Sequence, residues 1–298
     1  MNSAETPAAP GPAIAVVGHC EWAEFVQVEQ VPAAGQIVHA ETAGIEAAGG
    51  GAVAAVQASR LAGGCRFITA LGGDRTGDLT LERLEDMGLD VHAARRNPAQ
   101  RRAFVMLDSR GERTITTIGE RLGASGVDPL PWGEVEGFDA VYFTAGDAAA
   151  LQAARAARRL VVTVRAREAL AGSGVQVDVL VASVNDRGEQ YRRGDVDPVP
   201  EWVVRTDGPE GGTLESAEGE VTHWSSKPLP GTIQDAYGAG DSFAAGLTCG
   251  LGMGLEIGEA ISLGAFCGAS AIQGSGPYGS QASAGDLPAW RELYGISG

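Results

Sequence analysis

Lysine is almost absent from this chain of 298 residues, and that absence argues against two kinds of enzyme site. Lys227 is the single lysine among the 22 basic residues, and it stands in the segment Ser-Ser-Lys-Pro. A Walker A loop needs a lysine between a glycine and a serine or threonine, because its ammonium group binds the phosphates. A Schiff-base enzyme needs a lysine nucleophile. Lys227 is poorly placed for either chemistry, so we expect neither.

Positive charge is scarce as well. The chain carries 38 acidic residues, and its formal net charge is −16 at pH 7. Nucleic acids and anionic membrane surfaces attract clusters of Lys and Arg, so neither is an expected partner. No apolar run reaches the length that spans a bilayer. Residues 1–12 lack the positive start and apolar stretch of a signal peptide, so we expect a disordered tail on a cytoplasmic protein.

Cysteine and histidine are few and lack the spacing of metal ligands. The four cysteines and four histidines form no CxxC and no HExxH pattern. Structural and catalytic zinc sites use such spacings, so we expect no zinc. Each cysteine lies beside apolar or small residues, which predicts reduced, buried thiols. The four are Cys20, Cys65, Cys249 and Cys267.

Apolar runs of strand length alternate with helical patterns along the chain. Residues 13–18 and 66–71 are short apolar runs that predict buried strands. Residues 51–62 and 76–87 repeat apolar side chains at helical spacing. Further strands are expected at 140–143, 160–164, 177–182 and 202–206, and further helices at 148–159, 240–251 and 256–272. This alternation predicts an α/β fold, a doubly wound and mostly parallel sheet with helices on both faces.

Two segments have the pattern of exposed β hairpins. One spans about residues 21–40, with a turn at Pro32 and Gly35 and a strand resuming at residues 37–39. The other spans about residues 101–119, and a further polar hairpin is expected at residues 213–224. We expect the first two to form a small β lid inserted into a single domain that covers residues 13–298.

The strongest chemical pattern is the segment Asp-Ala-Tyr-Gly-Ala-Gly-Asp-Ser-Phe at residues 235–243. Gly238, Ala239 and Gly240 let the backbone approach a ligand closely, and the amides at a helix start bind anions. Asp241 in the first helical turn would lie beside that anion. A carboxylate there suits a base that removes a proton from an attacking hydroxyl. A plain glycine-rich helix start would look the same, so the residues alone leave both interpretations open.

This segment closely resembles the Asp-Thr-x-Gly-Ala-Gly-Asp-x-Phe signature of the ribokinase (PfkB) family of sugar and nucleoside kinases. Ala236 takes the place of the threonine. Residues 48–51, Ala-Gly-Gly-Gly, are similar to the N-terminal Gly-Gly signature of the family. The likeness runs in the same order from about residue 13 to about residue 278, both hairpins included. It implies a ribokinase-like fold and an ATP-dependent phosphotransferase.

The resemblance also implies roles on the phosphate side. Asp241 would be the general base, and Gly238, Ala239 and Gly240 would form the anion hole. Residues 206–211 are similar to the family's nucleotide loop. The implied contacts of that loop to ATP are Thr206, Asp207, Gly208 and Gly211.

Two cation sites are implied by the same likeness. Asp186 and Glu189 occupy the place of the family's Asn-x-x-Glu, which helps to hold magnesium and phosphate. Asp186 would then bind nucleotide, and Glu189 would contribute indirectly to Mg²⁺ binding. Asp235, with backbone carbonyls near residues 271–276, resembles a monovalent-cation site that would take K⁺.

The acceptor side departs from the family. Residues 21–23, Glu-Trp-Ala, stand where the sugar kinases carry Asn-x-Asp, and Val53 replaces an Asn that also reaches the sugar. Asp147 stands where ribokinase has an acidic sugar contact. The implied substrate-binding positions are Glu21, Ala23, Gly49, Gly50, Gly51, Val53, Asp147 and Asp241. Because two polar groups are missing, we expect D-ribose to be a poor substrate and the acceptor to be bulkier or less hydroxylated on that side.

The expected function is therefore that of an ATP-dependent PfkB-type carbohydrate kinase acting on a small sugar-like acceptor, with a homodimer formed through the lid. Two alternatives stay open: a nucleoside kinase, and a catalytically silent protein that binds a metabolite or nucleotide on the same fold. A dinucleotide-binding Rossmann protein is disfavoured, because no GxGxxG follows the first strand.

Overall fold

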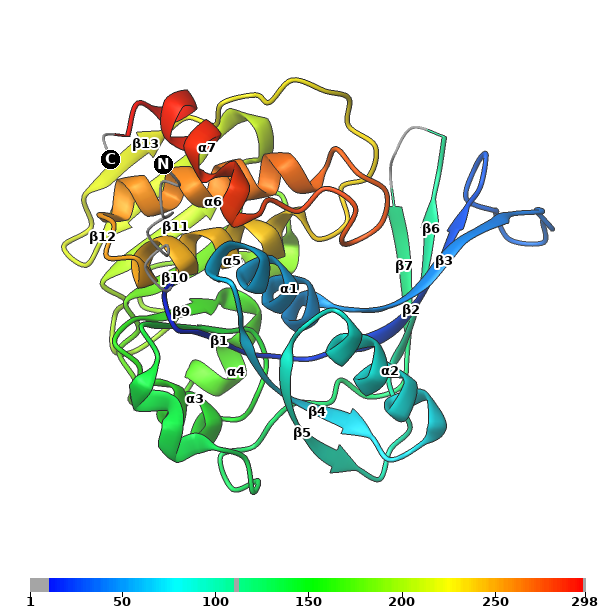
Figure 1. Ribbon diagram of the computed structural model, residues 1–298, viewed down its shortest axis with the longest axis horizontal. Helices are drawn as coiled ribbons and strands as arrows, with labels where there is room; N and C mark the ends of the chain where they lie inside the picture. Colours follow the sequence, from blue (N-terminus) through cyan, green and yellow to red (C-terminus); the bar gives the residue numbers. More distant parts are fainter. Residues whose placement is uncertain (1–10, 110–112, 297–298) are drawn as a thin grey trace, which may run out of the picture.

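A large twisted sheet is the frame of the molecule (Figure 1). The computed structural model describes residues 11–109 and 113–296. Within those residues the sheet has nine strands in the order β13-β12-β11-β10-β9-β8-β1-β4-β5. All strands from β11 to β5 pair in parallel, and β12 and β13 add an antiparallel edge. Their bounds are β1 Ile14–Val17, β4 Arg66–Gly72, β5 Asp90–Arg96, β8 Ala140–Phe143, β9 Leu160–Thr163, β10 Val179–Ser183, β11 Trp202–Thr206, β12 Gly212–Ser216 and β13 Val221–Trp224.

Helices cover both faces of this sheet. Ile14 and Val16 of β1 pack into one hydrophobic cluster, whereas Ala15 and Val17 pack into another, as the alternation of side chains along a strand requires. The first cluster includes residues of α1, α2, α5, α6 and α7, and the second includes residues of α3 and α4. The doubly wound α/β fold is thereby confirmed. The helices are α1 Gly50–Ala62, α2 Arg75–Asp86, α3 Ala148–Ala154, α4 Arg167–Leu170, α5 Ala239–Gly252, α6 Ile257–Ala271 and α7 Leu287–Tyr294.

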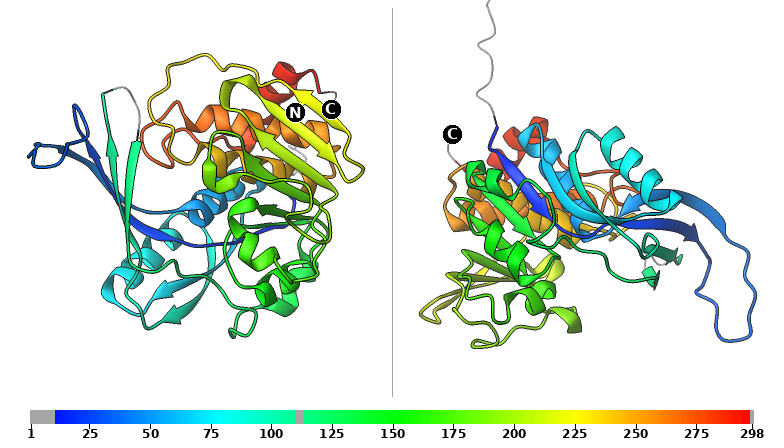
Figure 2. Two further views of the ribbon diagram at one scale, coloured as in Figure 1. Left: turned by 180° about the vertical axis from the view of Figure 1, so that it is seen from behind. Right: turned by 90° about the horizontal axis from the view of Figure 1, so that it is seen from below.

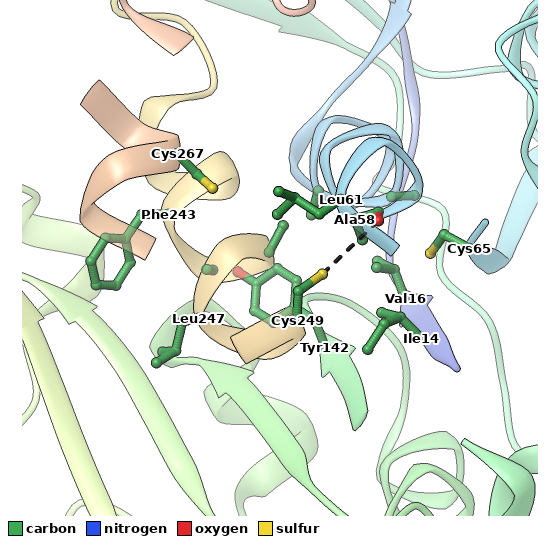
Figure 3. Close-up of a cluster of buried hydrophobic side chains, with 14 of the residues drawn as sticks. Ile14, Val16, Ala58, Leu61, Cys65, Tyr142, Phe243, Leu247, Cys249 and Cys267 are labelled. Atoms are coloured by element: carbon green, nitrogen blue, oxygen red, sulfur yellow. Dashed lines mark hydrogen bonds between the residues drawn. The ribbon is translucent and has the colours of Figure 1, made fainter. Parts of the chain in front are cut away.

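Helices α5 and α6 approach closely because small residues line their contact. A Cβ atom added at Gly246 of α5 would lie 2.7 Å from Cys267 Sγ and 3.0 Å from Gly264 Cα. Cys249 faces α1, where its thiol donates to the carbonyl oxygen of Ala58 at 4.0 Å (Figure 3). All four cysteines are buried and unpaired, as their surroundings in the sequence predict. The start of α5 is therefore held on a tightly packed helix.

A second sheet projects from one side of the main body (Figures 1 and 2). Its strand order is β3-β2-β6-β7. Strands β2 and β6 pair in parallel, and each forms an antiparallel pair with its own hairpin partner. The bounds are β2 Glu21–Gln27, β3 Glu41–Ala48, β6 Arg102–Leu107 and β7 Arg113–Ile118. Because β2 begins close after β1 and β3 runs straight into α1, this sheet is tied to the carboxyl edge of the main sheet.

Some expected elements are wrong. The strand expected at residues 37–39 is loop, with Ile37 90% exposed, and the pairing strand is β3, whose last residues Ala47 and Ala48 are fully buried. Strand β5 was not expected, because its sequence Asp-Val-His-Ala-Ala-Arg-Arg has no apolar run. The helix expected at 148–159 ends at Ala154, and the strand expected at 177–182 begins at Val179. No helix in the described ranges is long and apolar enough to cross a membrane.

Candidate active site

The predicted site residues gather at the carboxyl edge of the parallel sheet. In the sheet, β4 and β5 lie on one side of β1, and β8, β9, β10 and β11 lie in turn on its other side. The strand order thus reverses between β1 and β8. In open α/β sheets the crevice at such a reversal is where ligands bind. The start of α5 lies at this edge, beside the segments that follow β1 and precede α1.

The start of α5 is built for close backbone approach. Gly238 has a left-handed φ of 78°, and a Cβ atom there would lie 2.7 Å from Cγ1 of Val53. A side chain is thus excluded at Gly238 both by conformation and by space. A Cβ atom at Gly240, by contrast, would meet nothing within 4 Å. The first-turn amides of a helix have no intrahelical acceptor, so a helix start with open space beside it favours an anion.

Asp241 lies in the first turn of α5 and is partly buried. A Cβ atom on Gly50 would stand 2.7 Å from Asp241 Oδ1, so a side chain at position 50 would displace the Asp241 carboxylate. Burial, and then the negative charge of Glu189, raise the pKa of Asp241 to about 6, against the opposing charges of Arg165, Arg113 and Arg121. A carboxylate with a pKa near neutrality is suited to accept a proton and later release it.

A chain of side chains runs across the floor of the site beside Asp241. Arg121 Nη2 donates to His19 Nδ1 at 3.0 Å, His19 Nε2 lies 3.9 Å from Glu21 Oε1, and Glu21 Oε1 is 2.8 Å from Arg101 Nε. Burial and the charges of Arg121 and Arg101 hold the pKa of His19 well below its ordinary value. The ring is therefore neutral and carries its proton on Nε2. Burial raises the pKa of Glu21, although Arg101 opposes that shift.

The glycines before α1 are pressed against this floor. Gly49 has a φ of 90°, and a Cβ atom on it would lie 3.2 Å from Glu21 Cγ and 3.4 Å from His19 Cδ2. A Cβ atom on Gly51 would lie 2.6 Å from the His19 carbonyl oxygen. The run of three glycines thus brings the start of α1 against the end of β1. That contact sets the position of Glu21 relative to Asp241.

Three of the expected acceptor contacts have other partners in the structure. Ala23 and Val53 are both 0% exposed and pack with Phe25 and Tyr237 beneath the lid. The apolar residues that replace the family's polar groups have thus become part of a small hydrophobic core. Asp147 caps α3, where its carboxylate accepts hydrogen bonds from Ser125 Oγ and from the amides of residues 126 and 150. Substrate contact by Ala23, Val53 or Asp147 stays a prediction.

On the nucleotide side, the carboxylates that follow β10 are already paired. Arg165, which follows β9, contacts Asp186 through Nη2, and its Nε lies 2.5 Å from Glu189 Oε1. The other oxygen of Asp186 accepts a hydrogen bond from the amide of Gly188 at 2.7 Å. Across the described residues, no group of three or more His, Cys, Asp or Glu side chains could hold a metal ion. The binding of nucleotide by Asp186 and the indirect contribution of Glu189 to Mg²⁺ binding stay predictions.

The expected nucleotide loop follows β11 as a short turn. Thr206 donates through its hydroxyl to the carbonyl oxygen of Ala182 at 3.3 Å, and Asp207 accepts from Asn185 Nδ2 at 3.1 Å. Gly208 and Gly211 both have positive φ, 55° and 95°, which a turn of this tightness requires. The loop therefore lies beside the segment that carries Asp186 and Glu189. Its contact with ATP stays a prediction.

Asp235 joins two loops beneath the start of α5. It is 4% exposed, and its carboxylate oxygens accept hydrogen bonds from the amides of Tyr237 at 2.9 Å and Gly276 at 3.0 Å. This arrangement fixes the residues before Gly238 against the loop that follows α6. The binding of K⁺ at this carboxylate stays a prediction.

The sequence interpretation missed the arginines of the site. Arg101, Arg121 and Arg165 come from three separate segments and converge around His19, Glu21 and Asp241. A signal for one of them existed: Arg165 follows the apolar run of β9, in the position where functional residues of parallel sheets occur. Arg101 and Arg121 flank a lid strand pair and carry no such signal.

The sequence model of the pfkB family carbohydrate kinases matches residues 12–194 and 161–284. The chain belongs to the pfkB family of carbohydrate kinases. The second matched range includes residues 235–243, which form the start of α5, and the resemblance stated from the sequence is confirmed at family level.

Curated pfkB relatives match the chain over segments. A ribokinase of Dictyostelium discoideum is 32% identical over 108 residues, which are 36% of this chain and 34% of the relative. The fructoselysine 6-kinase of Escherichia coli (strain K12) is 44% identical over 55 residues, 18% of this chain and 21% of the relative. The matched part is thus about a third or less of the length of these relatives.

Solved structures of the pfkB fold superpose over nearly the whole chain. The Arabidopsis thaliana ribokinase complexed with ribose and ATP gives a TM-score of 0.73 at 21% identity, covering 96% of this chain and 100% of that one. The nucleoside kinase of Methanocaldococcus jannaschii gives 0.72 at 14% identity, covering 95% and 99%. At these identities the likeness establishes the ribokinase-like fold.

Proposed function

We propose that this chain is an ATP-dependent kinase that transfers the γ-phosphoryl group to a hydroxyl of a small sugar-like acceptor. One observation carries the proposal: Asp241, with a pKa raised to about 6, stands beside the open amides at the start of α5. A proton acceptor and an anion site thus lie within one helical turn. Phosphoryl transfer to an alcohol needs that combination.

In the proposed reaction, the acceptor hydroxyl gives its proton to the Asp241 carboxylate and its oxygen attacks the γ-phosphorus. The bond to the bridging oxygen breaks in line, and ADP leaves. The amides at the start of α5 stabilise the charge that develops on the transferred group. Mg²⁺ enters with the nucleotide as part of the substrate MgATP. Residues 206–211 and the segment around Asp186 are the proposed nucleotide side.

The decisive experiment replaces the base and follows ADP formation. Wild-type protein is screened with D-ribose, D-fructose, nucleosides and cyclitols under a coupled ADP assay, and the best acceptor is then used with Asp241→Asn. We expect kcat to fall by about 10² or more, because loss of a general base costs that much, while ATP affinity by calorimetry changes little. The matched control is Asp86→Asn, an exposed aspartate on α2 far along the chain from the site.

Two outcomes would contradict the proposal. Full turnover in Asp241→Asn would remove the base assignment. Nucleotide binding without ADP formation for any acceptor would favour the catalytically silent alternative. A nucleoside as the best acceptor would instead keep the chemistry and change the acceptor class to that of a nucleoside kinase.

A homodimer through the lid is the proposed assembly. The two edge strands of the lid expose isoleucines: Ile45 of β3 is 47% exposed, and Ile115 and Ile118 of β7 are 43% and 48% exposed. Exposed apolar side chains on open strand edges favour pairing with another chain. We expect light scattering to give twice the chain mass, and Ile115→Lys to shift the protein toward the monomer. A wild-type monomer at high micromolar concentration would contradict this assembly.

A further inference from the structure

We infer that the acceptor of the proposed kinase carries an oxyanion, a carboxylate or a phosphate monoester, and that Arg121 binds it. This inference rests on the proposed function and names its acceptor class. Arg121 is exposed and follows the lid strands. Its guanidinium donates to His19 Nδ1 and lies 3.5 Å from the carbonyl oxygen of Thr144. Both partners are neutral, and no carboxylate of the described residues lies within 4.0 Å of it.

The other arginines at the site are already paired or face a ring. Arg101 is bound by Glu21, and Arg165 is bound by Asp186 and Glu189. Arg113 of β7 lies over the ring of Tyr237 at 5.9 Å. Among these four arginines of the described residues, Arg121 is therefore the one whose guanidinium contacts neither a carboxylate nor a ring, although the charges of Glu21 and Asp241 act on it from further away. A guanidinium presents a planar fork of donors that matches the two oxygens of a carboxylate or phosphate.

Arg121 opens onto a cavity of about 370 Å³ at the carboxyl ends of β8 and β9. Arg165 lines the same cavity. Asp147 lines it too, but its carboxylate already accepts hydrogen bonds from the Ser125 hydroxyl and from two backbone amides. The Ser125 hydroxyl therefore has its proton engaged as well. Glu168 is exposed to solvent, which screens its charge. Of the two arginines that line the cavity, Arg121 is the one without a carboxylate partner among the described residues, and its donors favour a ligand that offers oxygen acceptors.

The position of this cavity relative to Asp241 suits a substituent of the acceptor. Arg121 contacts one edge of the His19 ring, and a Cβ atom on Gly50 would be 3.5 Å from His19 Cε1 and 2.7 Å from Asp241 Oδ1. His19 and Gly50 thus lie between Arg121 and Asp241, and the two side chains are near enough for their charges to interact. The space beneath the lid is filled by Val53 and Ala23, so the acceptor extends toward Arg121 instead.

The test compares acceptors that differ only in the oxyanion. Ribitol is paired with D-ribonate, which are both open chains, and D-fructose with D-fructose 1-phosphate, which both form rings, so that each member keeps a terminal hydroxyl for phosphorylation. For wild-type protein we expect kcat/KM to be about ten- to a hundred-fold higher for the anionic member of at least one pair, as a charge-assisted hydrogen bond provides. The ribonate and phosphate arms distinguish a carboxylate from a phosphate monoester.

Arg121→Gln should abolish that preference while leaving the KM for MgATP within about threefold. Arg75→Gln, an exposed arginine on α2 that pairs with Glu82, is the matched control and should keep the wild-type preference. Calorimetric binding of D-ribonate and D-fructose 1-phosphate to wild type and Arg121→Gln provides a readout independent of turnover. The inference is overturned if the neutral members are preferred, if neither anion binds wild type, or if the variant loses neutral and anionic acceptors equally. In each case ADP formation with a neutral acceptor would still support the kinase.

Discussion

The two walls of the candidate site are made in different ways. The wall at the start of α5 comes from one continuous segment, residues 235–243, held by the carboxylate of Asp235 and by packing of Gly238 on Val53. The opposite wall combines the end of β1 with arginines from three segments that are distant in the sequence. A wall formed by one segment is fixed by local geometry. A wall formed by several segments can change its shape and charge when any one of those segments changes in sequence. The same phosphate site can therefore be combined with binding sites for different acceptors.

Gly240→Val is the most severe way to break the first wall alone. A Cβ atom added at Gly240 would meet no neighbouring segment within 4 Å, so a side chain there would extend into the space proposed for phosphate. Turnover should fall about a thousandfold, as when oxyanion-site donors are lost, and Tm should not fall, because valine is no worse than glycine inside a helix. Gly258→Val is the matched control: Gly258 is also the second residue of its helix, is exposed and has open space at its Cβ. Equal turnover of the two variants would place the phosphates elsewhere.

The raised pKa of Asp241 predicts that kcat/KM depends on pH, and the residues of the second wall do not account for this dependence. Asp241 must be ionised to accept a proton, so kcat/KM should fall about tenfold per pH unit below about pH 6. His19 is not the source, because its pKa is held well below the ordinary value. For stability the sign is opposite: the folded state binds this proton more tightly than the unfolded chain, so the contribution of Asp241 becomes more stabilising as pH falls through 6.

Asp241→Asn tests both signs together. The residual activity of the variant should show no fall near pH 6. Its Tm at pH 8 should be at or above that of wild type, because a partly buried charge has been removed. A fall that persists unchanged in the variant would assign the titration to another group. A lower Tm would mean that favourable interactions of the charged carboxylate outweigh the free-energy cost of burying it.

The sequence predicted the first wall well because its information is contiguous. The start of α5, its small residues and Asp241 follow each other directly, and the buried strands appear as apolar runs. Strand β5 escaped prediction because an edge strand beside β4 is held by ladder hydrogen bonds and not by apolar composition. The second wall depends on contacts between distant segments, such as Arg121 with His19, 102 residues apart in the chain. No local pattern encodes such a contact.

Val53 gives the smallest predicted effect and separates the expectation from the structure most sharply. The sequence places Val53 at the acceptor, whereas the side chain is 0% exposed and would touch a Cβ atom on Gly238 at 2.7 Å.

Val53→Thr keeps the shape of the side chain and replaces one methyl group with a hydroxyl. If that hydroxyl faced an acceptor, KM would change and stability would not. In the structure it would enter an apolar core, where bonding back to the Gly49 carbonyl would satisfy it only in part. We therefore expect a loss of about 1 kcal/mol in the free energy of unfolding, measured by urea denaturation, with KM for the best acceptor unchanged within twofold. A changed KM for the acceptor with an unchanged free energy of unfolding would show that Val53 contacts the acceptor.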